Sequence, residues 1–165
     1  MIIKDNYLDV DQLAEVKKNL EHSEFPWYYR QDIVDVEDPA YMTHVFFETS
    51  NPSRYLPIIQ PILNKLNCGP LIQIRSNLVF KQTNPISVGW HTDNRYKNAK
   101  TAIFYLQTCN GPTVLKKEKE IFVNSVENRM LVFDSCIEHK AILHTDIKRR
   151  IVININYFER ENHES

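Results

Sequence analysis

The chain of 165 residues is predicted to form a mainly β domain with N-terminal helices. Three observations predict this class. Helical spacing of apolar residues is confined to 9–22 and 53–67. From about residue 71 onward, short apolar runs alternate with polar turns. Side chains of different character alternate most clearly in the run over 149–158. We therefore expect one domain over 1–165, with a helical cover and first strands in 1–70 and a β core in 71–158.

Two helices are expected before the β core. Residues 9–22 carry apolar side chains on one stripe, and Asp9 or Asp11 is available as the N-cap. The helix over 53–67 contains two prolines. Pro57 fits its first turn, whereas Pro61 should kink or interrupt it.

Several strands follow. Residues 101–107 alternate, with Tyr105 on the face of the polar strand ends, and residues 128–135 form a strand that leads to His139. Residues 112–115 and 121–123 should pair around a solvated turn at 116–120. The pattern is consistent with a double-stranded β-helix, a cupin-like jelly roll that closes two sheets around a pocket.

The last strand has two different faces. Its apolar face, which the helices should cover, is formed by Ile151, Ile153, Ile155 and Tyr157. Its more polar face is formed by Arg150, Val152, Asn154 and Asn156. A polar face on a central strand usually lines a cavity or meets water.

The motif His91-Thr92-Asp93, followed later by His139, is the strongest functional signal. Two imidazoles and one carboxylate form a facial triad, which suits non-haem Fe(II) that handles oxygen. An apolar run and a proline-containing turn precede the motif, so His91 should lie where a strand meets a loop.

The chain resembles the 2-oxoglutarate- and Fe(II)-dependent oxygenases, specifically the small prolyl-4-hydroxylase-like members of tailed phages and marine bacteria. The resemblance is strong over about 70–158 and rests on an ordered set of pieces: Asn77-Leu78, Gly89 to Asp93, Phe104 to Leu106, Asn110-Gly111, Glu127 to Asp134, His139, Arg149-Arg150 and Asn156 to Phe158. It extends weakly to 5–8 and 25–29. One departure is Gly111-Pro112 in place of a Gly-Gly pair, which leaves the conformation of that turn open.

The resemblance implies that His91, Asp93 and His139 are the iron ligands, that Arg150 binds the distal carboxylate of 2-oxoglutarate, and that Tyr105 is its hydroxyl partner. A guanidinium pairs bidentately with a carboxylate, and a buried tyrosine hydroxyl needs a partner. Further pocket residues are expected to be Asn77 and Asn154 near the cosubstrate and Trp90, Asn94 and Asn156 near the substrate.

Two of these assignments have rivals. His144 is the rival third ligand, but it lies nearer to Arg150 than the resemblance leads us to expect. Arg149 is the rival clamp, but it shares a face with the isoleucines and should snorkel at the start of its strand. The remaining histidines lack a partner ligand at suitable spacing and are expected to be surface or packed residues: His22, His44 and His163.

The resemblance implies hydroxylation of a C–H bond in a peptidyl proline, an amino acid or a small metabolite, with use of O2 and release of succinate and CO2. Asp93 argues against a halogenase, in which this carboxylate is missing. Nucleic-acid demethylases usually carry a second arginine where Asn156 stands. The alternatives are a cupin-like metal enzyme that does not use 2-oxoglutarate and a non-catalytic jelly-roll binding module.

Composition limits the partners and the cellular compartment that we expect for the protein. The net charge is −1, with 20 basic and 21 acidic residues, which does not suggest a nucleic-acid binder. Cys68, Cys109 and Cys136 form no CxxC pair, so a reducing compartment is expected. Neither a membrane span nor a signal peptide is apparent. We expect a cytoplasmic protein of a bacterium or phage-infected host, and its oligomeric state stays open.

Overall fold

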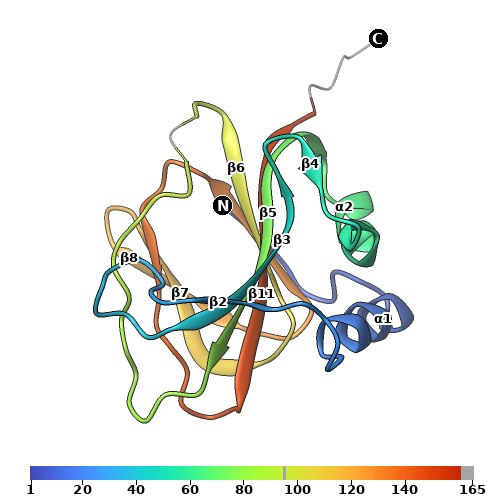
Figure 1. The fold of residues 1–165 in the computed structure, drawn as a ribbon. Coiled ribbons are helices and arrows are strands. Elements are labelled where there is room, and N and C mark those ends of the chain that lie inside the picture. The colour runs from blue at the N-terminus through green and yellow to red at the C-terminus, as the bar shows by residue number, and fades with distance from the viewer. Residues whose placement is uncertain (95, 161–165) are drawn as a thin grey trace.

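The computed structural model describes residues 1–94 and 96–160, which form two antiparallel sheets (Figure 1). Residues of both sheets line a cavity. The major sheet has the order β1 (Ile2–Lys4), β9 (Arg129–Asp134), β6 (Ala99–Tyr105), β11 (Arg149–Glu159), β5 (Cys68–Phe80), β3 (Tyr41–Glu48) and β2 (Tyr28–Arg30), and β4 (Asn51–Pro52) pairs with β3. The minor sheet has the order β10 (His139–Ala141), β7 (Cys109–Lys116) and β8 (Glu120–Ser125). The predicted fold class is therefore confirmed.

The first predicted helix is present as α1 (Val10–Leu20), and the Asp9 side chain caps it by accepting a hydrogen bond from the Gln12 backbone at 2.9 Å. The second predicted helix is shorter than 53–67 and is divided into a 3-10 turn, η1 (Leu56–Ile59), and α2 (Gln60–Lys65). Proline has no N–H and fits the first turn of a helix, and Pro57 and Pro61 lie in the first turns of η1 and α2. No helix of the described part of the chain is long and apolar enough to cross a membrane.

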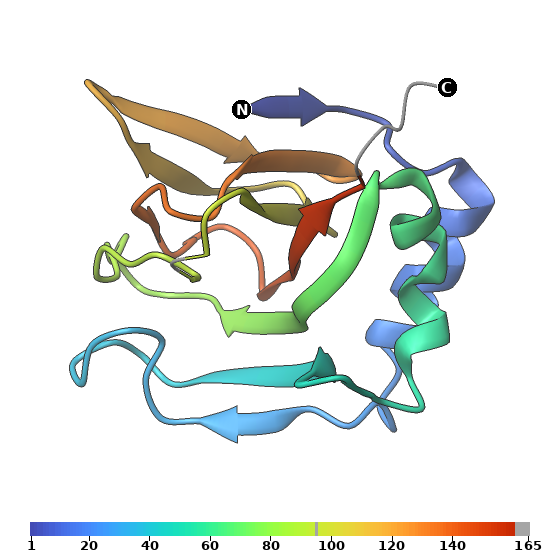
Figure 2. The same ribbon diagram turned by 90° about the horizontal axis from the view of Figure 1, so that it is seen from above.

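The helices pack on the outer face of the major sheet, as Figure 2 shows. Leu20 of α1, Ile59 of η1 and Ile62 of α2 belong to one core cluster with the apolar face of β11, and all three are fully buried. The apolar residues of that strand are at most 1% exposed: Ile151, Ile153, Ile155 and Tyr157. The helices thus cover the isoleucine face, as predicted.

The predicted hairpin is β7 with β8, and its turn contains the charged residues at 117–119. Gly111 and Pro112 lie within β7, where the pairing with β8 is irregular. A bulge tolerates a proline because the ladder is already interrupted there. A Cβ at Gly111 would lie 2.7 Å from the Ile142 carbonyl oxygen, so only glycine allows this close approach.

Candidate metal centre

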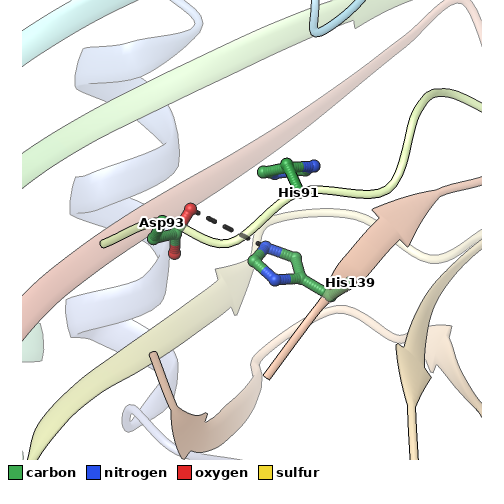
Figure 3. A group of neighbouring side chains, drawn as sticks. All are labelled: His91, Asp93 and His139. Carbon is green, nitrogen blue, oxygen red and sulfur yellow. Dashed lines mark ion pairs between the residues drawn. The ribbon is translucent and has the colours of Figure 1, made fainter. Parts of the chain in front are cut away.

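Backbone pairing between two segments far apart in sequence brings His91 and His139 together. The His91 N–H donates to the His139 carbonyl at 3.1 Å, and the His139 N–H donates to the His91 carbonyl at 2.8 Å. The two ring centroids consequently lie 4.4 Å apart. Asp93 completes the group: one ligand atom from each of the three side chains lies within 4.8 Å of the others, and His139 Nε2 is 3.7 Å from Asp93 Oδ1 (Figure 3).

Hydrogen bonds orient both imidazoles. Nδ1 of His91 lies 3.2 Å from the Gly89 carbonyl oxygen, and Nδ1 of His139 lies 3.2 Å from the Ile137 carbonyl oxygen. Each neutral ring can donate its Nδ1–H to that carbonyl, which leaves the Nε2 lone pair available. Two Nε2 atoms and a carboxylate form a donor set that fits a divalent transition metal such as Fe(II).

The cluster is largely shielded from solvent, with side-chain exposures of 2% for Asp93 and 6% for His139. Burial lowers the pKa of His139, and the charge of Asp93 opposes this effect. The neutral imidazole, which is the form that binds metals, is therefore favoured. The hydroxyl of Thr101 on β6 donates to Asp93 Oδ2 at 2.7 Å and holds the carboxylate in place. Sequence reasoning did not identify Thr101 as a site residue, although it shares a strand face with Tyr105.

A cavity of about 110 Å³ begins at the two histidines and extends between the sheets. Ile33 and Val34 contribute to its wall from the loop before β3. A Cβ at Gly89 would lie 2.2 Å from Asp35 Oδ2, so glycine lets this loop pack against the turn that leads to His91. The strand residues lining the cavity include Arg75, Asn77, Val79, Ile103, Thr113, Arg150, Val152 and Asn154.

The structure places the two rival arginines on opposite sides of the major sheet. Arg150 lines the cavity, is 4% exposed, and has a buried Nε without a hydrogen-bond partner among the described residues. One of its terminal nitrogens is 3.5 Å from Thr113 Oγ1. Arg149 lies outside the cavity, where its guanidinium is 3.6 Å from the Glu21 carboxylate at the end of α1.

Tyr105 does not line the cavity. It is fully buried, and its hydroxyl donates to Thr113 Oγ1 at 2.8 Å, so Thr113 is the residue that lines it. Burial raises the pKa of Tyr105, which keeps the hydroxyl protonated. Sequence reasoning missed Thr113 because its place beside Arg150 depends on how the minor sheet faces the major one.

The other predicted pocket residues fall into two groups. Asn77 and Asn154 line the cavity, and the Asn154 side-chain oxygen has no partner among the described residues. Trp90, Asn94 and Asn156 lie instead in two surface hollows beside the metal cluster. The Trp90 ring is 4.2 Å from the Lys140 ammonium. The structure therefore separates these three residues from the main cavity.

The other described histidines lie outside the metal cluster. His144 is fully buried, neither of its ring nitrogens has a hydrogen-bond partner among the described residues, and burial lowers its pKa. His22 is exposed, and His44 is packed with hydrogen bonds to the Pro26 carbonyl and the Ser53 hydroxyl, as expected of surface or packed residues. His163 lies outside the described residues.

Arg75 on β5 is a second cavity arginine that sequence reasoning missed. A signal was present, since polar side chains at 73, 75 and 77 alternate with Ile74, Ser76 and Leu78. This is the same alternation that revealed the two faces of the last strand.

No family model matches this chain, and no curated protein matches it. Solved structures do. A prolyl hydroxylase from Trichoplax adhaerens, in complex with a peptide fragment of the hypoxia inducible factor oxygen degradation domain, has a TM-score of 0.70 at 15% identity, over 96% of this chain and 83% of that one. A prolyl-4-hydroxylase from Pseudomonas putida has a TM-score of 0.66 at 13% identity, over 96% and 92%.

A third similar structure is the α-ketoglutarate-dependent epimerase SnoN from nogalamycin biosynthesis, with a TM-score of 0.65 at 14% identity, over 96% of this chain and 77% of that one. At these identities the likeness establishes the fold. The chain has the jelly-roll fold of 2-oxoglutarate- and Fe(II)-dependent oxygenases, in agreement with the resemblance found in the sequence.

Proposed function

We propose that the protein is an Fe(II)- and 2-oxoglutarate-dependent dioxygenase that hydroxylates a C–H bond of a peptidyl proline, an amino acid or a small metabolite and releases succinate and CO2. One observation carries the proposal. The lining of one cavity includes the two histidines of the His91, Asp93 and His139 cluster and, farther along its wall, a buried guanidinium whose Nε has no partner among the described residues.

The burial of Arg150 supports a carboxylate ligand. Among the described residues, no carboxylate forms an ion pair with it, and its contacts are Thr113 and the face of the Tyr105 ring. A buried charge without a partner is costly, whereas a bidentate carboxylate would satisfy its donors. The distal carboxylate of 2-oxoglutarate would supply that partner.

When bound, Fe(II), 2-oxoglutarate and O2 together supply the oxidising chemistry. His91, Asp93 and His139 would hold the metal, and the Thr101 hydroxyl, which donates to Asp93 Oδ2, keeps that carboxylate oriented. Apolar residues of the major sheet and of the segments between strands would exclude water from the cavity: Val79, Val88, Ile103 and Leu143.

Tyr105 is proposed to act on the cosubstrate through Thr113. Because the Tyr105 hydroxyl donates to Thr113 Oγ1, the Thr113 hydroxyl is free to direct its own proton into the cavity. Arg150 and Thr113 would then donate together to the distal carboxylate. In this proposal Thr113, and not Tyr105 itself, makes the hydroxyl contact with 2-oxoglutarate that the sequence assigned to Tyr105.

The choice of substrate and reaction is part of the proposal. The Trichoplax structure is described with a peptide, whereas SnoN is described as an epimerase, so one fold serves different chemistry. A metal enzyme that does not use 2-oxoglutarate gives no reason for the unpaired Arg150, and a binding module gives no reason for the metal cluster. The cytoplasmic location stays a prediction from the sequence.

The proposal is tested by anaerobic titration with Fe(II) and then 2-oxoglutarate, followed by the weak visible charge-transfer band of an iron-chelated keto acid. Wild type should show the band. Arg150→Met should need about a hundredfold more 2-oxoglutarate, because a buried charge pair contributes about 2–5 kcal/mol. The matched control Arg149→Met, on the outer face, should stay within about twofold of wild type. Binding of Fe(II) without any band would show that 2-oxoglutarate is not the cosubstrate.

A further inference from the structure

Arg75 lies toward the metal end of the cavity, away from Arg150. On the two central strands of the major sheet, Arg75 pairs in register with Asn154, whereas Arg150 pairs with Val79. The two arginines are thus four residues apart along each strand, or about 13 Å at the rise of a β-strand. The next residue on this face of β11 after Asn154 is Asn156, whose side-chain oxygen is 2.9 Å from the hydroxyl of Thr101, the residue bound to Asp93.

The Arg75 guanidinium lacks a counter-charge. Its Nε is buried without a hydrogen-bond partner among the described residues, and the residues that line the cavity include no acidic side chain. The other cations of the lining are accounted for. Lys140 lies 3.7 Å from the Glu120 carboxylate and close to the Trp90 ring, and Arg150 is assigned to 2-oxoglutarate by the proposed function.

The cosubstrate would leave this charge unmatched. The two positive charges of Fe(II) and the positive charge of Arg150 would be balanced by three negative charges, those of Asp93 and of the two carboxylates of 2-oxoglutarate. Arg75 would then keep one positive charge on the cavity wall, with its Nε buried although the residue as a whole is partly exposed. Because leaving a buried donor of a charged group unpaired is costly, a further anion is expected there during turnover.

We propose that Arg75 binds a carboxylate of the primary substrate, so that the substrate is a small free carboxylic acid and not a residue within a peptide chain. The inference rests on the proposed function and narrows its substrate class. Asn154, the register partner of Arg75, offers an unpaired side-chain oxygen beside the guanidinium. A free α-amino acid matches both groups, since its carboxylate accepts from Arg75 and its ammonium donates to Asn154.

The test uses acetate, the simplest carboxylate, and 15N NMR of the arginine Nε–H groups. The protein is loaded with Zn(II), which is diamagnetic, then titrated to saturation with 2-oxoglutarate, and only then titrated with acetate. The Arg75 and Arg150 signals are identified by their loss in Arg75→Lys and Arg150→Lys. We expect 2-oxoglutarate to shift the Arg150 signal, and acetate to shift the Arg75 signal afterwards in a saturable manner. Acetamide, an uncharged analogue of acetate, should shift neither.

Two outcomes would overturn the inference. If acetate leaves the Arg75 signal unmoved, Arg75 is not a carboxylate site. If 2-oxoglutarate alone shifts that signal and acetate adds nothing, Arg75 serves the cosubstrate. Binding can also be followed through the relaxation or chemical shift of acetate itself, which should change when the protein is added. This response should be lost in Arg75→Met and kept in the control Lys140→Met, which removes another cavity cation. A failure of the proposed function would give a different result, because the Arg150 signal would then not respond to 2-oxoglutarate. In that case, acetate added to the metal-free protein would still test whether Arg75 binds a carboxylate.

Discussion

The two faces of β11 differ in whether their groups are satisfied. The outer face packs against the helices, and its side chains are at most 1% exposed: Ile151, Ile153, Ile155 and Tyr157. The inner face carries Arg150 and Asn154, each with a buried polar atom that has no partner among the described residues. Both faces belong to one strand, and neighbouring residues alternate between them. The outer face therefore supplies stability, and the inner face retains unpaired groups that a ligand can satisfy.

The largest effect should come from breaking the metal cluster on the cavity side. His139→Ala removes one of three ligands and should weaken Fe(II) binding by at least about a hundredfold, because even the loss of an outer-shell partner costs roughly 10–100-fold. The far-UV circular dichroism spectrum should stay that of a folded β protein. Affinity is measured by anaerobic titration with Fe(II).

His144→Ala is the matched control for His139→Ala. His144 is buried but lies outside the cluster, so its variant should bind Fe(II) within about threefold of wild type. The opposite result, with metal binding lost in His144→Ala and kept in His139→Ala, would make His144 the third ligand.

Adjacent substitutions on β11 compare its two faces directly. Ile153→Ala should lower the free energy of unfolding in urea by about 2–5 kcal/mol, because it leaves a cavity in a fully buried core. Asn154→Ala should change it by less than about 1 kcal/mol, because its amide oxygen has no protein partner to lose. Asn154→Ala should instead alter the affinity for cosubstrate or substrate. Equal destabilisation by both substitutions would contradict the division of roles.

The sequence predicted the outer face well because period-two alternation determines which side chains share a face. The 149–158 pattern gave both faces of β11, and the helices that cover it followed from their apolar stripes. The length of the second helix was wrong. Pro61 lies in the first turn of a new helix, and the apolar spacing of 53–67 continues through the break between η1 and α2.

The cavity was less predictable because its lining comes from segments that only the folded chain brings together. Thr113 reaches Arg150 from the minor sheet, and the loop before β3 packs against Gly89 in the turn that leads to His91. Neither contact has a local sequence signal. Arg75 did have one, in the alternation of β5, but alternation alone does not reveal that the arginine lacks a partner.

Acidification should destabilise the metal-free protein through its buried histidines. Burial lowers the pKa of His44, so below the ordinary value of 6.5 the unfolded chain takes up a proton that the folded chain does not. Stability is therefore complete above pH 6.5 and falls as the pH decreases, by about 1.4 kcal/mol per unit for one such group. Urea unfolding of wild type and His44→Gln between pH 7 and pH 5 measures this. His44→Gln should have the shallower slope, and identical slopes would show that His44 is protonated in the folded state.

The smallest predicted effect concerns Thr101, a fully buried residue on the cavity side of β6. Its hydroxyl donates to Asp93 Oδ2, so Thr101→Val keeps the shape of the side chain and removes that donor, together with the hydroxyl's contacts to Asn156 and Ser135. Such an outer-shell loss should weaken Fe(II) binding by about tenfold. Thr101→Ser retains the hydroxyl and should restore most of the affinity, even though it loses a buried methyl group and some stability. The Fe(II) affinity of wild type, Thr101→Val and Thr101→Ser should follow the presence of the hydroxyl. If it followed the free energy of unfolding instead, Thr101 would serve packing. The cavity side of the sheet would then resemble its helix-covered side more closely than the pattern of unpaired groups indicates.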